Sequence, residues 1–210
     1  MKRTPRYLSD GLFTRGLSFL CDRDLDLARV VQKYGPPPMW ARKAGFPTLI
    51  HIILEQQVSL ASARAAFDRL QGSVSPLTPR RFLNLDDATL KAIGFSRQKM
   101  QYARGLALSI VGGRLKIGAL SVMEDSAVRA ELIKIKGIGS WTADIYLLMA
   151  LRRPDVWPKG DLALAVVAQR VKRLRSLPTE DELAALSESW KPWRAVAARI
   201  LWHYYLSHRL

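Results

Sequence analysis

Two glycines and one aspartate are the residues of this 210-residue chain whose types and spacing most directly suggest chemistry. Gly137 and Gly139 flank Ile138, between an apolar helix predicted before them and a new helix predicted from Ser140. Glycine adopts positive φ angles and allows a partner to approach the backbone closely. Such a turn can point backbone N–H groups outward at the positive end of a helix dipole, which favours phosphate binding.

The residues around this turn strengthen the prediction. Ile138 is expected to pack back and pin the turn, while Lys134 and Lys136 add positive charge beside it. A Gly-x-Gly sequence alone also fits an ordinary connection between two helices. The phosphate-site interpretation therefore depends on the wider pattern.

Asp161 follows Pro158-Lys159-Gly160, a rigid and then flexible entry to a predicted helix. An aspartate at that place is commonly an N-cap. The helix dipole and nearby donors favour the ionised form of the carboxylate, so Asp161 is expected to be an anion at neutral pH. An N-cap and a catalytic carboxylate are compatible roles.

The composition limits the classes of protein to consider. Apolar residues make up 49% of the chain, which predicts a globular fold, and 33 Lys and Arg against 18 Asp and Glu give a net charge of +15. A folded chain this basic favours a polyanion or an anionic surface as partner, but charge alone does not choose between nucleic acid and membrane.

The hydropathy pattern argues against a membrane protein. The longest apolar run is about seven residues, Ile145–Leu151, against the ~20 that a spanning helix needs. The basic N-terminal segment lacks the apolar core of a signal peptide. We expect a cytoplasmic, intracellular protein of bacterial type that acts at the nucleoid and has no membrane partner.

The cysteine and histidine content predicts no cofactor. Cys21 is the only cysteine, which excludes an intrachain disulfide and a four-thiolate iron–sulfur cluster. His51, His203 and His208 lack the spacing of zinc ligands.

Apolar residues recur at spacings of three and four between start and stop signals, which predicts an all-α fold. The chain is expected to form a single domain over residues 1–210. The predicted helices are Asp24–Tyr34, Phe46–Gln57, Ser59–Gly72, Asp86–Ile93, Ser96–Val111, Asp125–Lys134, Ser140–Leu151, Asp161–Leu174, Thr179–Ser189 and Trp193–His208.

Together, the segments Ile135–Ala143 and Val156–Asp161 resemble the hairpin, Gly/Pro-rich loop and aspartate of the helix-hairpin-helix DNA glycosylase superfamily. The similarity is greatest to its alkylbase, 3-methyladenine type II branch, in a short form without an N-terminal β-domain, and it covers roughly residues 25–206. Supporting segments are Leu54–Ser59, Gly94–Lys99 and Trp190–Arg194. The resemblance implies two helical lobes flanking a DNA and base cleft, with the hairpin at about 125–152 and the catalytic loop at 153–161.

The resemblance implies hydrolytic excision of alkylated purines, such as 3-methyladenine and 7-methylguanine, from duplex DNA, which starts base excision repair. Asp161 would stabilise positive charge on the deoxyribose, and one carboxylate suffices because an alkylated purine leaves easily. Asp144 is expected to be structural. Superfamily members that also cut the strand carry a lysine two residues after the second hairpin glycine, where this chain has Trp141, so no Schiff base is expected there.

The resemblance also implies how the damaged base is reached. Gln57 would occupy the intercalating wedge position after the base is flipped out, with Gln56 before it; solvated helix-end residues are the alternative. A tryptophan face favours a cationic base. Candidate pocket residues are Trp141, Ile145, Trp190, Trp193 and Trp40, whereas Trp157 and Trp202 are assigned to the core.

The expected contacts to the DNA backbone are Lys134, Lys136, Gly137, Ile138, Gly139, Ser140, Thr142, Arg97 and Lys99. The basic run from Arg170 to Arg175 is either a solvated face or a further DNA contact. The backbone carbonyls of Ile133, Ile135 and Gly137 resemble a family site for a structural sodium or potassium ion.

Other functions remain open from the sequence. The chain could excise a mispaired or oxidised base, because pocket shape decides specificity. It could also be a non-catalytic helix-hairpin-helix DNA-binding protein, although such a protein gains nothing from Asp161 facing DNA. A monomer bound to damaged duplex DNA is the expected state.

Overall fold

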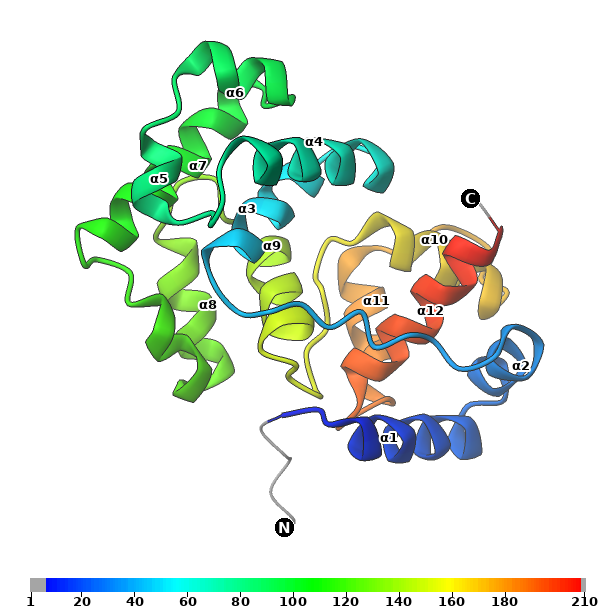
Figure 1. The fold of residues 1–210 in the computed structure, drawn as a ribbon. Coiled ribbons are helices and arrows are strands. Elements are labelled where there is room, and N and C mark those ends of the chain that lie inside the picture. The colour runs from blue at the N-terminus through cyan, green and yellow to red at the C-terminus, as the bar shows by residue number, and fades with distance from the viewer. Residues whose placement is uncertain (1–6, 209–210) are drawn as a thin grey trace. The chain divides into compact units, whose positions relative to one another are not determined.

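The structure, a computed structural model, describes residues 7–208, which form helices and connecting loops without a β-strand (Figure 1). This confirms the predicted all-α fold. The described chain divides into two compact units. One contains residues 42–146, and the other combines residues 1–41 with residues 147–210, of which 1–6 and 209–210 lie outside the described residues.

The second unit, residues 42–146, contains α3 (Phe46–Glu55), α4 (Leu60–Ser73), α5 (Pro79–Leu83), α6 (Asp87–Ile93), α7 (Arg97–Val111), the 3-10 helix η1 (Ile117–Val122), α8 (Asp125–Ile133) and α9 (Ser140–Ile145). Helix α3 is its central element, because seven of its ten residues are buried and it packs against α4, α7 and α9. An almost wholly apolar helix of this kind is stable only inside a core.

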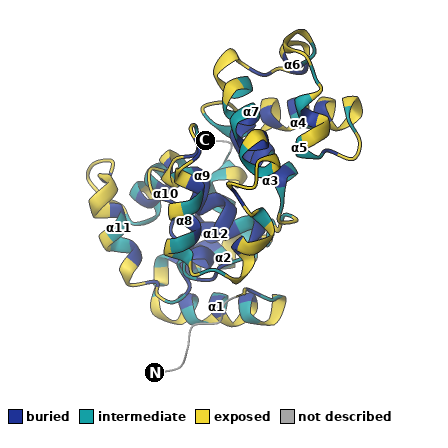
Figure 2. Cartoon of the chain, turned by 90° about the vertical axis from the view of Figure 1, so that its left-hand side faces the viewer, coloured by how far each residue is buried: buried dark blue, intermediate teal, exposed yellow. Residues whose placement is uncertain are grey.

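The first unit contains α1 (Asp10–Arg23), α2 (Leu25–Tyr34), α10 (Leu162–Val171), α11 (Glu180–Glu188) and α12 (Arg194–His208). Helix α12 is buried continuously from Ala195 to Trp202, as the dark blue of this helix in Figure 2 shows, and packs against α1, α2 and α10. A π-helical segment, η2 (Tyr146–Ala150), continues α9 directly, where the sequence predicted one regular helix to Leu151.

A buried arginine holds three segments of the first unit together. Arg199 is fully buried, and its guanidinium donates to the carbonyls of Met39 (2.7 Å), Ala195 (2.8 Å) and Leu148 (2.8 Å). Burial lowers the pKa of Arg199 to about 9, so the group stays protonated at neutral pH. A buried cation is tolerated because carbonyl oxygens replace its water.

The start of α2 is fixed by a second polar cluster. The Asp24 carboxylate caps α2 and accepts hydrogen bonds from the Lys172 ammonium (2.5 Å) and the Trp190 indole N–H (2.7 Å). Although burial opposes ionisation, these hydrogen bonds lower the pKa of Asp24. Lys172, part of the basic run considered for DNA contact, is thus committed to an ion pair inside this unit.

A histidine of α3 packs within the second unit. The His51 ring stacks on Phe67 with centroids 4.2 Å apart, and its Nε2 lies 3.7 Å from the Glu55 carboxylate, which is also paired with Arg42. Burial lowers the pKa of His51 below its usual 6.5. The folded protein therefore takes up a proton at His51 less readily than the unfolded chain does.

We predict that this histidine makes the protein less stable in acid. Its contribution is complete above pH 6.5 and is lost as the pH falls below that value, because the unfolded chain then binds the proton first. The variant His51→Phe keeps the aromatic stack and cannot ionise. Urea unfolding followed by circular dichroism between about pH 7 and pH 5 should give a flatter curve of unfolding free energy against pH for the variant. Equal slopes would contradict the prediction.

Candidate nucleic-acid interface and active-site carboxylate

The predicted hairpin is present between α8 and α9. Gly137 has φ +91°, and Ile138 is 3% exposed and tucked under the turn as expected. The Ile138 N–H donates to the Ile135 carbonyl (3.0 Å) and so closes the turn, while the contact of Ile138 with the DNA backbone stays a prediction. Gly139, which has extended backbone, and Ser140 remain exposed at the start of α9.

The two hairpin glycines have different reasons to be glycine. A Cβ atom on Gly137 would lie 2.0 Å from the ring of Tyr102, so this tyrosine of α7 packs directly on the glycine backbone. A Cβ atom on Gly139 would meet nothing within 4 Å. Gly137 is therefore required by the protein itself, whereas Gly139 leaves open space for a partner outside it.

The hairpin helices are also joined by an ion pair. The Arg129 guanidinium of α8 donates to the Asp144 carboxylate of α9 (2.5 Å), and Asp144 is buried. This agrees with the structural role expected for Asp144. The ion pair thereby joins the short α9 to α8.

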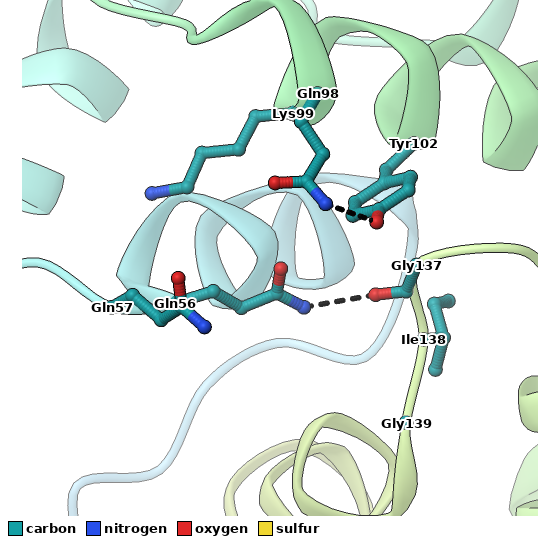
Figure 3. A pocket seen from close by; sticks show the side chains of 8 residues that line it. All are labelled: Gln56, Gln57, Gln98, Lys99, Tyr102, Gly137, Ile138 and Gly139. Atoms are coloured by element: carbon teal, nitrogen blue, oxygen red, sulfur yellow. Dashed lines mark hydrogen bonds between the residues drawn. The ribbon is translucent and has the colours of Figure 1, made fainter.

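The turn between α3 and α4 lies beside the hairpin in the same unit (Figure 3). Gln56 is half-buried, and its amide nitrogen donates to the Gly137 carbonyl (2.9 Å) and to the Thr142 hydroxyl (2.9 Å). Gln57 is exposed and has φ +56°, a left-handed conformation that is uncommon for a residue with a Cβ atom. The side chain of Gln57 is thus exposed, whereas that of Gln56 is held by hydrogen bonds to the hairpin.

A pocket of about 390 Å³ lies where these elements meet. It is lined by Gln56, Gln57, Gln98, Lys99, Tyr102, Gly137, Ile138 and Gly139 (Figure 3). The lining combines amides, one ammonium and a phenol with the backbone of the hairpin glycines and Ile138, so it mixes polar and apolar groups.

The predicted DNA-backbone contacts divide into available and committed groups. Lys136 and Arg97 are exposed, and Lys134 is exposed while paired with Glu131. The Lys99 ammonium donates to the Leu54 carbonyl at the end of α3 (2.7 Å), and burial lowers its pKa. Thr142 is 2% exposed and its hydroxyl accepts from Gln56, and its contact with DNA stays a prediction.

Asp161 lies in the other unit, at the start of α10. Its Oδ1 accepts from the Leu164 backbone N–H (2.9 Å) and lies 3.4 Å from the indole nitrogen of Trp202 on α12. The side chain is 8% exposed. The expected N-cap role is confirmed, and the carboxylate is held by a helix start and an indole at once.

Sequence reasoning missed the contact between Trp202 and Asp161. Trp202 is 9% exposed, in keeping with its assignment to the core, yet its polar edge faces the carboxylate. The only sequence signal was chemical: a buried indole N–H needs an acceptor. The two positions are 41 apart in the chain, and nothing local to either one indicated which acceptor it is.

The other candidate pocket residues have different surroundings. Trp190 and Trp193 are 1% and 6% exposed, Trp190 tilts against Trp157 (ring centroids 5.3 Å apart), and Trp193 covers Gly16. Their predicted base-stacking role is therefore not supported. Ile145 is buried in α9 of the other unit, where Trp141 is half-buried.

Trp40 is a distinct case. It is half-buried, has φ +46° and tilts against His203, the residue after Trp202, with ring centroids 6.3 Å apart. The Arg199 bond to the preceding carbonyl, that of Met39, fixes the backbone there. Trp40 thus keeps part of its ring accessible within the unit that carries Asp161.

No group of three or more His, Cys, Asp or Glu side chains within residues 7–208 is arranged to hold a metal ion. Of the carbonyls considered for a monovalent cation, that of Ile135 accepts from Ile138 and that of Gly137 accepts from Gln56. A carbonyl oxygen has a second lone pair, so these bonds leave the oxygens able to bind a cation. Nor is any helix of the described chain both long and apolar enough to cross a membrane.

The glycine-built hairpin and the helix-capping aspartate define a class of DNA repair proteins. Residues 50–192 match the family described as HhH-GPD superfamily base excision DNA repair protein. The chain belongs to this superfamily.

Within the superfamily, the chain is similar to 3-methyladenine DNA glycosylases. It is 30% identical to DNA-3-methyladenine glycosylase 1 of Schizosaccharomyces pombe, over 84% of this chain and 79% of that protein. It is 27% identical to YfjP of Bacillus subtilis, provisionally named a DNA-3-methyladenine glycosylase, over 84% of this chain but only 64% of the length of YfjP. The solved structure of the S. pombe 3-methyladenine DNA glycosylase Mag1 in complex with abasic DNA superposes with a TM-score of 0.84 at 27% identity, covering 91% of this chain and 96% of that one.

The two glycines give a matched pair of substitutions. We expect Gly137→Ala to lower the free energy of unfolding by about 3 kcal/mol, because the new methyl group meets Tyr102 and the positive φ disfavours alanine. Gly139→Ala should change it by less than about 0.5 kcal/mol, since its surroundings are open. Urea unfolding measures both, and equal losses would show that the Tyr102 contact does not limit the turn.

Proposed function

We propose that this protein is a monofunctional DNA glycosylase that flips alkylated purines out of duplex DNA and hydrolyses their N-glycosidic bond. The observation that carries the proposal is the Asp161 carboxylate, fixed by the Leu164 N–H and next to the Trp202 indole, in a chain of the HhH-GPD superfamily. The glycine turn of the hairpin, with positive φ at Gly137, and the net charge of +15 support duplex DNA as the partner.

The chemistry follows from the charge of the leaving group. As the base departs, positive charge develops on the deoxyribose, and a nearby carboxylate stabilises it. The helix start and the indole hold Asp161 in one orientation before the reaction, so little reorganisation is needed in the transition state. A purine alkylated at a ring nitrogen already carries a positive charge and needs no separate general acid.

Aromatic residues in the unit of Asp161 favour the same substrates. The face of an indole attracts a cationic ring, with a gain of about 0.5–2 kcal/mol that depends on desolvation. Trp40 retains partial exposure, whereas Trp202 is buried with its edge at Asp161. We propose Trp40, in place of Trp190 and Trp193, as the aromatic surface for the extruded base, and Trp202 as the indole that orients the carboxylate.

The unit of residues 42–146, which carries the hairpin, binds the duplex in this proposal and holds the DNA stack open once the base has left it. Flipping a nucleotide out costs a few kcal/mol of stacking and pairing. We propose that Gln57 fills the gap, which its exposure on a strained turn supports. The exposed residues proposed to contact phosphates from the same unit are Gly139, Ser140, Lys136 and Arg97.

We expect the isosteric variant Asp161→Asn to lower the single-turnover release of 7-methylguanine from duplex DNA by about 100-fold or more, because the charge at the sugar is lost. Asparagine still accepts from the Leu164 N–H, so the melting temperature and duplex affinity should change little. Retention of the wild-type rate would remove Asp161 from the mechanism. A wild-type protein that releases no alkylated purine would overturn the substrate assignment.

We also expect hydrolysis without strand cleavage, since Trp141 provides no amine. Incubating the protein with lesion-containing DNA and sodium borohydride should give no covalent complex, whereas a lysine nucleophile would be trapped as a reduced imine. The products should be a free base and an intact strand bearing an abasic site. A borohydride-dependent adduct on a denaturing gel would refute this prediction.

A further inference from the structure

A single side chain joins the turn at residues 56–59 to the hairpin at residues 134–140. The amide nitrogen of Gln56 is 2.9 Å from the Gly137 carbonyl oxygen and 2.9 Å from the Thr142 hydroxyl oxygen (Figure 3 draws the first contact). Because a carbonyl only accepts, the amide must present its nitrogen to Gly137. Both amide hydrogens of Gln56 are therefore used within the protein.

The hairpin end of this link is a peptide unit held from three directions. Its C=O belongs to Gly137 and accepts from Gln56, while its N–H belongs to Ile138 and donates to Ile135 (3.0 Å). The Tyr102 ring packs over the Gly137 Cα atom. Since the peptide is planar, fixing both its ends sets the direction in which the chain continues to Gly139.

At the other end of the Gln56 side chain, its backbone leads directly into Gln57, the residue with positive φ. A positive φ costs of order 1 kcal/mol in a residue with a Cβ atom and persists only where neighbouring contacts impose it. Three hydrogen bonds restrain the chain just before it: one from the Lys99 ammonium to the Leu54 carbonyl (2.7 Å) and two from the Gln56 amide. After it, Ser59 caps α4 and fixes the chain again.

We propose that Gln56 is a positioning residue that couples backbone binding to base extrusion. Gln56 holds the Gly137 peptide and the strained Gln57 in one arrangement. The phosphate-binding turn and the wedge thereby keep a fixed position relative to each other. A duplex bound at the hairpin then meets Gln57 already in its inserting conformation. This inference rests on the proposed function, and it reassigns Gln56 from the wedge itself to the support of the wedge.

The test compares Gln56→Met, Gln57→Ala and the double variant. Methionine has nearly the length of glutamine and lacks the N–H donors. With both hydrogen bonds lost, we expect single-turnover release of 7-methylguanine from duplex to slow by about tenfold, but release from a single strand by less than about twofold. Affinity for an undamaged duplex, measured by fluorescence anisotropy, should fall by less than about threefold, because the phosphate contacts remain.

The double variant separates a positioning role from a general structural one. If Gln56 acts through Gln57, the double variant should be no slower on duplex than Gln57→Ala alone. Multiplied losses in the double variant, or equal losses on duplex and single strand, would overturn the inference. So would a wild-type duplex rate in Gln56→Met.

Two further variants control for folding. Gln71→Met changes an exposed glutamine of α4 in the same unit and should leave every rate unchanged. Thr142→Val removes one acceptor of the Gln56 amide while keeping the shape of the buried side chain, and should slow duplex release in the same pattern but less. If Gln56→Met does not fold, Thr142→Val decides.

A fluorescence measurement that does not require base excision distinguishes this inference from the proposed function. A 2-aminopurine placed beside an abasic site brightens when the stack is opened, whether or not a base is excised. Failure of the wild type to release any base would overturn the proposed function alone. A wild-type extrusion signal that is unchanged in Gln56→Met would overturn the coupling alone.

Discussion

The conformation of one peptide unit, between Gly137 and Ile138, governs the arrangement of the hairpin unit. Its left-handed glycine allows Tyr102 to pack on the backbone, its carbonyl receives Gln56, and its N–H closes the turn on Ile135. Helices α3, α7, α8 and α9 all supply or border one of these contacts. No residue with a Cβ atom fits there, so a single glycine determines how the four helices present their ends.

The unit that carries Asp161 is organised differently, by charged side chains that are hydrogen-bonded to fixed donors and acceptors. Arg199 is surrounded by carbonyls, Asp24 by an ammonium and an indole, and Asp161 by a helix start and an indole. Buried charges that are fully bonded in this way restrict the number of arrangements that helices can adopt. A rigid carboxylate is useful in catalysis because it does not need to reorient when charge develops nearby.

The sequence predicted the helices most accurately where local signals were strong. The start of α4 after Ser59, of α7 after Ser96 and of α11 after Thr179 follows from side-chain caps that act within three residues. It missed α1 and the five-residue α5, and it extended a regular helix through the π-helical segment Tyr146–Ala150. Such features depend on packing, which local periodicity does not encode.

The sequence by itself determined the all-α class, the hairpin, the N-cap at Asp161 and the basic charge, because each depends on residues close together in the chain or on composition. Only the tertiary structure decided that Gln56 is tethered while Gln57 is exposed, that Lys99 and Thr142 are bonded internally, and that Trp202 is the tryptophan touching Asp161. These contacts join positions about 40 to 90 residues apart. Whether a polar side chain meets solvent or a buried acceptor depends on which helices pack together, and that is a property of the folded chain.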